Sequence, residues 1–268
     1  MSLYAEVLHH RELFANLFRR DFRSKYKGSV LGVMWSLVNP LVLMGIYTLV
    51  FSVLFPVSNV PHYPLYLLSG LAVWIFFSGT LATASRSLLD NANLIKKVRF
   101  PRQLAPFSTV ATQLVSLAAI FLVLIPVNFA VIPATRETVW LALPLVIPVI
   151  AIAAGLALAV SAANVLFRDV EHMVAALLLP WFFLTPIMYS FDAGGPLRGS
   201  IQHHHTVVEI LRYGNFITPP IEAIRAVLFW GRLPSWVDVV YLCVAAVLAL
   251  ALGAFVFRRV DDRIAVEL

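Results

Sequence analysis

The chain has 268 residues, of which 60% are hydrophobic and only 13% are charged, and its mean hydropathy is +0.87. A soluble domain carries about 25% charged residues, so this composition excludes an ordinary soluble protein and makes the lipid bilayer the expected solvent. The single cysteine, Cys243, excludes an internal disulfide and a cysteine-based metal site. Charged residues interrupt residues 1–28, so we expect no cleavable signal peptide there.

The N-terminal segment, residues 1–28, predicts an amphipathic helix. On a helical wheel one face collects large apolar side chains and the other collects polar and basic ones, with Arg11 and Leu13 as exceptions. The apolar face holds Leu3, Val7, Phe14, Phe18 and Phe22, and the polar face holds Glu12, Asn16, Arg19, Arg20, Arg23 and Lys27. We expect this helix to lie in the cytoplasmic membrane interface. Two roles stay open: a topology anchor, or a helix that guides an anionic lipid headgroup or receives a partner.

Charge-free runs then predict six membrane-spanning helices, at about residues 30–55, 63–85, 105–132, 139–165, 172–189 and 237–257. The 58 residues between Lys27 and Arg86 contain no charged side chain, and a span needs about 20 apolar residues, so this run holds two spans. The predicted fold class is an all-α integral membrane protein with one transmembrane domain over 1–268. It comprises an interface helix (1–28), six spans (29–257) with short outer helices between the fifth and sixth, and a cytoplasmic tail (258–268).

Lysine and arginine set the expected orientation. An even number of spans puts both termini on one side of the membrane, and that side receives 15 of the 20 basic residues. Because basic loops stay in the cytoplasm, both termini are predicted to be cytoplasmic. The net charge of +6 is then a topology signal. It forms no basic patch interleaved with aromatic residues, so we expect no nucleic-acid partner.

The cytoplasmic loop between the second and third spans predicts a short helix. Asn91 and Asn93 are helix-capping residue types, and Pro101 ends any helix just before it. An apolar pair, Leu94 and Ile95, is followed by basic residues. Such a helix suits docking into a groove on another protein, although a basic loop packed on the membrane would show the same composition.

The outer segment between the fifth and sixth spans predicts two short helices, "VVEILRYG" and "PPIEAIRAVLFWG", joined by "NFIT". Pro219 or Pro220 suits the first turn of the second helix. The three histidines at 203–205 cannot share one helix face and have no acidic or cysteine support nearby, so we expect an exposed loop and no metal site.

Several functional classes lack their sequence signals. No "GxxxxGK[ST]" phosphate-binding loop occurs, so this chain is not expected to bind ATP itself. No charged residue lies in the middle of a predicted span, which disfavours ion-coupled transport. No nucleophile and base, and no carboxylate pair, converge on a candidate catalytic site. The spans instead carry many aromatic residues, which stack on sugar rings but equally fill cores and interfacial belts.

Four stretches, in chain order, resemble the permease subunits of polysaccharide ABC exporters of the O-antigen and teichoic-acid type. They are "YKGSVLGVMWSLVNPLVLMGIYTLVFSVLF", "NANLIKKVRFP", "NVLFRDV" and "PWFFLTPIMYS". One departure is Asn215-Phe216, where the family usually has Asn-Pro. The resemblance implies a homodimer of this chain with two separate ATPase subunits in the plasma or inner membrane. ATP and magnesium would sit on those partners, so this chain would be a transport subunit, not an enzyme, with no cofactor of its own.

The resemblance also implies a cargo and three groups of residues. The cargo would be a polyprenyl-diphosphate-linked polysaccharide taken from the cytoplasmic side. The ATPase would couple through Asn93, Leu94, Ile95, Lys96 and Lys97. The diphosphate headgroup would load at Arg20, Arg23, Lys25, Tyr26 and Lys27, with Arg168 opposite them. The glycan path would be lined by Trp35, Tyr47, Phe51, Trp74, Phe77, Trp181, Phe182 and Tyr189. No metal ligands are expected.

Two alternatives stay open. The same fold exports teichoic acid, capsule, galactan or another amphiphile such as a drug or a simple lipid. The second alternative is a membrane enzyme that acts on lipid phosphates. Such an enzyme needs histidine, aspartate or arginine side chains that converge near one leaflet, and the predicted spans offer none.

Overall fold

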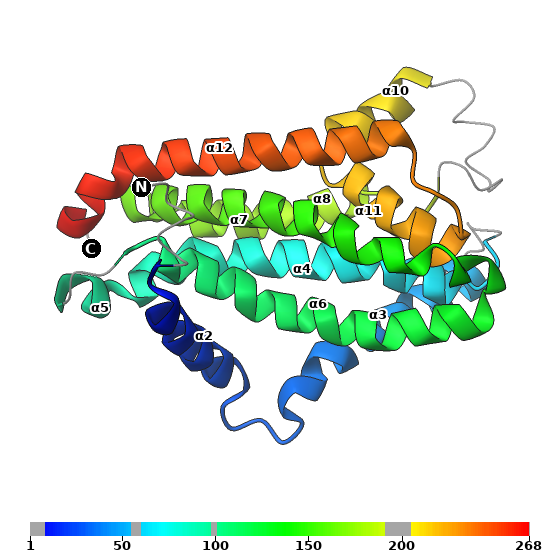
Figure 1. Ribbon diagram of the computed structural model, residues 1–268, viewed down its shortest axis with the longest axis horizontal. Coiled ribbons are helices and arrows are strands. Elements are labelled where there is room, and N and C mark those ends of the chain that lie inside the picture. The colour runs from blue at the N-terminus through cyan, green and yellow to red at the C-terminus, as the bar shows by residue number, and fades with distance from the viewer. Residues whose placement is uncertain (1–8, 55–59, 98–100, 191–204, 268) are drawn as a thin grey trace.

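A computed structural model describes residues 9–54, 60–97, 101–190 and 205–267, and all regular structure in these ranges is helical. Four long helices lie side by side: α4 (Tyr63–Asp90), α6 (Leu104–Val131), α7 (Ala142–Leu166) and α12 (Trp236–Glu267) (Figure 1). Short 3-10 turns, η3 (Pro133–Arg136) and η4 (Val139–Leu141), join α6 to α7. The expected all-α membrane class is confirmed at this level.

The N-terminal part forms a V beside this bundle (Figure 1). Its first arm is α2 (Arg11–Tyr26), which packs across α6 and buries Leu17. Its second arm is the 3-10 turn η1 (Gly32–Met34), α3 (Trp35–Thr48) and the π-helical turn η2 (Leu49–Leu54), which lie along α4. The predicted N-terminal helix therefore exists within 1–28, and it contacts the bundle. Its depth in a membrane stays a prediction.

Five helices are long and apolar enough to cross a membrane: Gly32–Ser52, Tyr63–Asp90, Leu104–Val131, Val139–Leu166 and Trp236–Asp261. They correspond to five of the six predicted spans. The remaining span, which is the fifth in chain order and was predicted at 172–189, is the shorter helix α8 (Val170–Leu184) of 15 residues. At 1.5 Å per residue it is about 23 Å long, against about 30 Å of hydrocarbon. Thr185 precedes Pro186 and is extended, because proline disfavours a helical residue before it.

The two predicted short helices of the outer segment are present, and the second is buried in the bundle. The first comprises α10 (His205–Glu209) and the π-helical turn η5 (Ile210–Gly214), and the second comprises α11 (Thr218–Arg225) and the π-helical turn η6 (Ala226–Trp230). Every residue from Thr218 to Phe229 is buried, and α11 packs against α4, α7 and α12. His203 and His204 lie outside the described residues.

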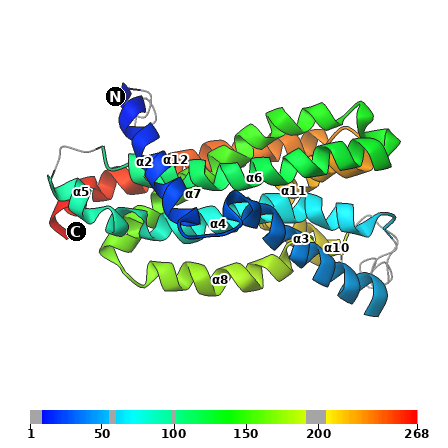
Figure 2. The same cartoon turned by 90° about the horizontal axis from the view of Figure 1, so that it is seen from below.

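The core has a main part and a smaller part at the end of the bundle where α5 (Ala92–Lys97) and the C-terminal half of α12 lie (Figures 1 and 2). Close packing of α7 on α12 contributes to both parts of the core. A Cβ atom on Gly155 would lie 2.3 Å from the backbone carbonyl of Ala249, so only glycine fits there. Small residues of this kind let membrane helices approach closely. The bundle is therefore a fixed frame against which α2, α3 and α8 lie.

Candidate functional site

The C-terminal end of α2 reaches into the side of the bundle through Lys25. Its Nζ atom donates to Oε1 of Gln113 at 2.8 Å and to Oγ of Ser116 at 2.9 Å. Both acceptors lie on α6, within the third predicted span. The hydroxyl of Tyr26 pairs with that of Ser36, which lies 3.2 Å from the hydroxyl of Ser116. Five polar side chains thus connect α2, α3 and α6.

The pKa of Tyr26 reflects the electrostatic environment of these five polar side chains. Burial opposes ionisation of its phenol. The hydrogen bonds from Ser36 and Ser116 and the charge of Lys25 outweigh burial, so the pKa of Tyr26 lies below the ordinary value for tyrosine. The surroundings of Lys25 therefore favour a negative group.

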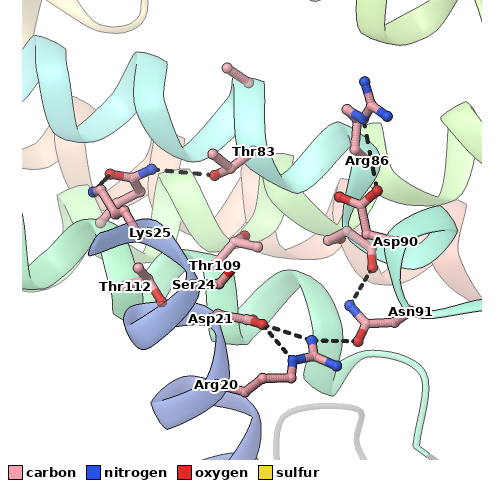
Figure 3. A pocket seen from close by; sticks show the side chains of 13 residues that line it. Arg20, Asp21, Ser24, Lys25, Thr83, Arg86, Asp90, Asn91, Thr109 and Thr112 are labelled. Atoms are coloured by element: carbon pink, nitrogen blue, oxygen red, sulfur yellow. Dashed lines mark hydrogen bonds and ion pairs between the residues drawn. The ribbon is translucent and has the colours of Figure 1, made fainter. Parts of the chain in front are cut away.

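Arg20, one turn earlier on α2, connects the helix to the corner between α4 and α5 (Figure 3). Its guanidinium pairs with Asp21 at 2.7 Å and donates to the side-chain oxygen of Asn91. Asp21 also accepts a hydrogen bond of 2.6 Å from Ser108 on α6. Asn91 is buried, donates to the backbone carbonyl of Ser87, and its own carbonyl accepts the first hydrogen bonds of α5. A movement of α5 would therefore be transmitted to α2.

Two adjoining cavities open beside these contacts, and we call them together the inner cleft, after the predicted orientation. The larger has a volume of about 680 Å³ and lies between α2, α4 and α6 (Figure 3). Its lining is mostly polar and includes Arg20, Ser24, Lys25, Thr83, Arg86, Asp90, Asn91, Thr109, Thr112 and Gln113. The smaller, of about 410 Å³, lies beside the start of α3 and includes Lys25, Tyr26, Trp35, Ser36, Pro40, Ile75, Gly79, Gln113 and Ser116. Lys25 and Gln113 line both cavities.

The inner cleft contains some of the predicted headgroup residues and leaves others out. Arg20, Lys25 and Tyr26 line it. Arg23, Lys27 and Arg168 are exposed and line neither cavity. The cation that α4 contributes is instead Arg86, which was not among the predicted residues. It lies 3.9 Å from Asp90 and 3.6 Å from Glu171 in the first turn of α8.

The predicted coupling residues form the helix α5, as expected, but they do not share one surface. Asn93 and Lys96 are exposed, and Leu94 is half-buried. Ile95 is only 8% exposed, because it packs in the smaller core cluster with residues of α4, α6 and α12. The expectation of an exposed apolar pair is therefore wrong for Ile95. The side chain of Lys97 lies outside the described residues, and ATPase contact by this helix stays a prediction.

The predicted path aromatics mostly meet where α3, α4 and α8 come together. Tyr47 stacks on Phe182 with ring centres 5.7 Å apart, and the ring of Trp181 lies 5.3 Å from Phe77 and 6.3 Å from Trp74. Trp74, Phe77 and Phe182 are buried in the core of this chain. Tyr47, Phe51 and Trp181 are half-buried, Trp35 is apart at the inner cleft, and Tyr189 lies beyond the end of α8. Whether these rings line a path stays a prediction.

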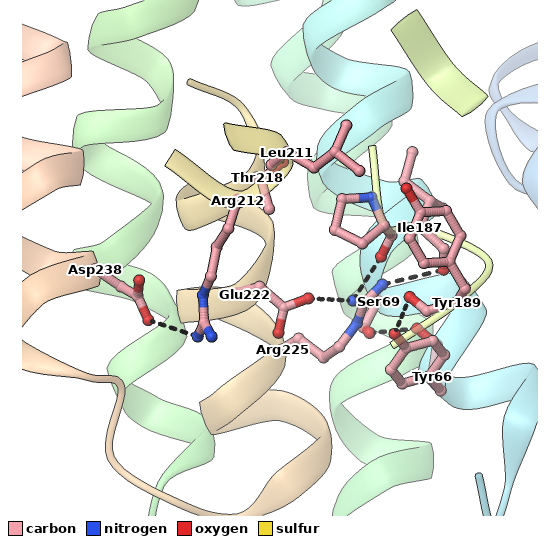
Figure 4. Close-up of polar contacts among 11 residues, drawn as sticks. Tyr66, Ser69, Ile187, Tyr189, Leu211, Arg212, Thr218, Glu222, Arg225 and Asp238 are labelled. Atoms are coloured by element: carbon pink, nitrogen blue, oxygen red, sulfur yellow. Dashed lines mark hydrogen bonds and ion pairs between the residues drawn. The ribbon is translucent and has the colours of Figure 1, made fainter. Parts of the chain in front are cut away.

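At the opposite end of the bundle, a fully buried arginine holds the backbone that follows α8 (Figure 4). Arg225 of α11 is 0% exposed and pairs with Glu222 at 2.7 Å. Its guanidinium also donates to the backbone carbonyls of Pro186, at 2.9 Å, and Ile187, at 3.1 Å. The same group lies 3.9 Å from the ring centre of Tyr66. A buried charge requires such compensation, and here an acid, two carbonyls and an aromatic face supply it.

Two tyrosines of α4 complete this arrangement, which we call the outer clamp: Tyr63, Tyr66, Glu222, Arg225 and the backbone of residues 186–189. Tyr63 donates to the carbonyl of Met188 and Tyr66 to that of Tyr189, each at 2.8 Å. Non-helical backbone at membrane depth must find its hydrogen bonds within the protein. The outer clamp therefore explains how the chain can leave α8 early and remain folded.

Asn215 makes a second attachment between α8 and the outer helices. Its side chain accepts a hydrogen bond of 2.8 Å from the indole of Trp181 and donates one of 2.9 Å to Thr185. Arg212 of η5 adds an ion pair of 3.8 Å to the buried Asp238 of α12 (Figure 4). The end of α8 and the pair of short helices thus form one connected unit.

Sequence reasoning missed the residues that make these contacts. Gln113 and Ser116 are uncharged, so a search for breaks in charge-free runs passes over them, although their spacing of three residues puts them on one helix face. Glu222 and Arg225 show the same spacing within the second predicted outer helix, whose burial was not predicted. A polar pair on one face of an otherwise apolar helix was the available signal in both cases.

The arrangement favours binding and movement over bond chemistry. No group of three or more histidine, cysteine, aspartate or glutamate side chains in the described residues is placed to hold a metal ion. The inner cleft offers cations, amides and hydroxyls beside an apolar wall, and the helices that flank it carry large exposed apolar faces.

Comparisons with known proteins give a consistent result. The model of the ABC-2 type transporter family matches residues 12–229. The chain is 30% identical over 262 residues to the O-antigen export system permease protein RfbA of Myxococcus xanthus, a match that covers 96% of each chain. It is 33% identical over 186 residues to an O-antigen export system permease protein RfbA of Klebsiella pneumoniae, covering 68% of this chain and 70% of the relative.

Proposed function

This chain belongs to the ABC-2 type transporter family, and from that premise we propose that it is the permease subunit of an ATP-driven exporter of lipid-linked, O-antigen-like polysaccharide. The observation that carries the proposal is the full-length similarity to the Myxococcus relative, which is named for O-antigen export. A match over 96% of both chains leaves no large part of either protein unaccounted for. The chain supplies the membrane path and its partner supplies ATP hydrolysis.

Two copies of the chain form the proposed transporter. The first spanning helix, Gly32–Ser52, buries only 6% of its most apolar stretch within its own chain. Val42, Ile46 and Leu49 on its surface are each at least half exposed, as are Leu177 and Phe183 on α8. Because α8 is too short to cross the hydrocarbon unaided, contact with a second copy would shield its ends from lipid. These faces support a homodimer with α3 and α8 at its interface.

The glycan path then runs between the two copies, past α3 and α8. Tyr47, Phe51 and Trp181 are the half-buried rings available to it, and the buried rings of Trp74 and Phe77 support them from behind. Each ring contact with a sugar is worth about 0.5–1.5 kcal/mol, taking the value for aromatic pairs as a guide. Contacts of that size would hold a moving polymer without trapping it.

The ATPase docks on α5, through the exposed Asn93 and Lys96. The buried Ile95 anchors this helix to the chain's own core, so α5 is held firmly enough to transmit a push. Asn91 passes that movement to α2 through Arg20, and Arg86 passes it to α8 through Glu171. The first described residues of α2 and the end of α12 lie at this end of the bundle, and its basic residues favour a cytoplasmic location.

Deletion of the gene tests the proposed function. We expect the deletion strain to lose its surface polysaccharide and to accumulate the lipid-linked glycan on the cytoplasmic side of the membrane. Re-expression of the wild-type chain should restore export, whereas Lys96→Glu, which reverses the charge at the docking surface, should restore it poorly. Export of an unrelated amphiphile with normal surface polysaccharide would contradict the assignment. Lipid extraction followed by mass spectrometry identifies the accumulated molecule in either case.

A further inference from the structure

The inner cleft combines a lysine, several hydroxyl groups and two adjoining cavities, which are features that suit a phosphate carried on a lipid. We propose that the phosphate binds at Lys25, where the two cavities meet, with its polar substituent in the larger cavity and its hydrocarbon chain leaving through the smaller one. For the identity of the molecule this inference rests on the proposed function. The site itself rests on the contacts and cavities of the described residues.

The first argument is charge. Arg20 pairs with Asp21, and Arg86 lies near Asp90 and Glu171. Lys25 differs, because its two hydrogen-bond acceptors are the neutral side chains of Gln113 and Ser116. Within the part of the chain that the structure describes, no carboxylate lies within ion-pair distance of its Nζ atom. The cleft therefore keeps one cation whose charge is still available to an anion.

The second argument is the supply of hydrogen-bond donors. A phosphate that leaves bulk water needs several donors around its oxygens. Tyr26, Ser36 and Ser116 bring hydroxyl groups to the same point, and Gln113 brings an amide whose nitrogen now makes only long contacts, of 3.3 Å to Gly79 and 3.4 Å to Thr83. The ammonium group of Lys25 has three N–H donors and uses two of them on Gln113 and Ser116, so one remains for a phosphate oxygen.

The third argument is a difference between the two cavities: polar side chains line almost all of the larger one, whereas the smaller one combines polar and large apolar side chains. The larger cavity is walled by hydroxyls of α4 and α6, and its volume of about 680 Å³ is within the range of pockets that hold small organic ligands. The smaller cavity adds the apolar side chains of Trp35, Pro40 and Ile75 to a lining that also includes Ser29, Ser36 and Asn39. Trp35 is 50% exposed at the start of the first span, where an indole contacts both headgroups and hydrocarbon. An amphiphile with a phosphate between its two parts fits this order.

Binding to the purified complex tests the site. The chain, with its ATPase, is placed in nanodiscs of phosphatidylcholine and titrated with geranylgeranyl diphosphate by calorimetry. Lys25→Gln should weaken binding by about tenfold to a hundredfold, the usual effect of losing a charged hydrogen bond, and Lys25→Arg should restore most of it. Lys27→Gln is the matched control, because Lys27 lies two residues away, is exposed and lines neither cavity. Equal affinity in Lys25→Gln and the wild type would overturn the inference.

A second variant separates ligand binding from a purely structural role of Lys25. Gln113→Glu puts a carboxylate within reach of Nζ, so it strengthens the link between α2 and α6 while it neutralises the site. We expect unchanged thermal stability and a loss of affinity similar to that in Lys25→Gln. If Gln113→Glu binds the diphosphate as the wild type does, Lys25 only connects two helices and the inference fails.

Two further measurements separate the possible sources of the phosphate and show which proposal a negative result contradicts, the phosphate site or the proposed function. If bulk phospholipid occupies the cleft, nanodiscs with phosphatidylglycerol should weaken diphosphate binding to the wild type but not to Lys25→Gln. If the export substrate occupies it, phosphatidylglycerol should have no effect. If the wild-type strain exports no polysaccharide, the proposed function is contradicted, but the binding result at Lys25 is not affected. If Lys25→Gln and Gln113→Glu both export normally, only the proposed phosphate site at Lys25 is contradicted.

Discussion

The inner cleft and the outer clamp each hold a basic side chain against the same bundle, and they do so in opposite ways. Lys25 is exposed, donates hydrogen bonds to two neutral side chains and borders two cavities. Arg225 is 0% exposed and is surrounded by a carboxylate, two backbone carbonyls and an aromatic ring. The first arrangement leaves a charge and a hydrogen-bond donor available to a ligand, whereas the groups around Arg225 already occupy its terminal nitrogens.

This difference shows that residue type does not identify a functional cation in a membrane protein. Arg225 would rank first in a search for unusual buried charges, yet the contacts of its two terminal nitrogens explain it as the group that satisfies a broken helix end. Lys25 looks ordinary by burial, but its charge is not neutralised. The comparison predicts that variants at the clamp lose stability first, whereas variants at the cleft lose transport first.

The largest effect is expected at Arg225. Arg225→Met keeps an apolar chain of similar length but removes the guanidinium that donates to Glu222 and to the carbonyls of Pro186 and Ile187. Breaking a buried ion pair in this way costs about 3–5 kcal/mol. We expect a large loss of folded protein, measured by fluorescence-detected size exclusion with heating.

Two control variants sharpen that result. Arg232→Met removes an exposed arginine from the loop that follows the same buried helix and should change stability little. Combining Arg225→Met with Glu222→Met should recover part of the loss, because the buried carboxylate that lost its guanidinium is then removed as well. A fully stable single variant would mean that the clamp does not hold the end of α8.

Gly70 on α4 should show the next largest effect, since it makes room for the same guanidinium. A Cβ atom at Gly70 would lie 2.4 Å from Nη2 of Arg225, and that group is fixed by its bonds to two carbonyls. Gly70→Ala should therefore destabilise the protein by about 1–3 kcal/mol, as overpacking does. Gly45→Ala on α3, where nothing lies within 4 Å, is the matched control and should be neutral or stabilising. Equal melting temperatures for the two variants would contradict the clamp geometry.

Asn91 and Asn93 differ by two positions and test how α5 is held at the inner end. Asn91 is buried and bonded to Arg20 and Ser87, so Asn91→Ala should cost about 1–2 kcal/mol of stability. Asn93 is exposed, so Asn93→Ala should leave the melting temperature unchanged and weaken copurification of the ATPase. If instead Asn93→Ala melts early and retains its ATPase, the docking surface lies elsewhere.

Much of the fold could be predicted because it follows from local patterns. Charge-free runs gave the long helices to within a few residues, except that α4 continues past Arg86 to Asp90 and α12 continues through the predicted tail to Glu267. A charged residue marks the edge of hydrocarbon, and a helix can continue beyond that edge. The early end of α8 was missed although Pro186 was visible, because a span of ordinary length was assumed.

The candidate site could be predicted only in part, because its geometry depends on contacts between distant segments. The basic end of α2 was identified, but the residues that receive Lys25 lie about ninety positions later in α6. The burial of Arg225 depends on Tyr66 and Gly70, which no pattern within its own helix reveals. Arg168 was expected opposite the basic cluster, whereas the third cation lining the cleft is Arg86.

The smallest effect on stability is expected at Lys25, and it decides whether the comparison holds. Lys25→Gln removes two hydrogen bonds from an exposed side chain that water can replace, so it should lower stability by at most about 1 kcal/mol. Export should nevertheless fall strongly, because the uncompensated charge is gone. Arg225→Gln, measured beside it, should show the reverse order, with early melting and export reduced only in proportion to the folded protein that remains. Melting temperature and export per folded complex, plotted for both variants, separate the two regions. Should Lys25→Gln lose stability and export together, as expected at Arg225, the cleft would be a second structural clamp, and its open cation would carry no transport function.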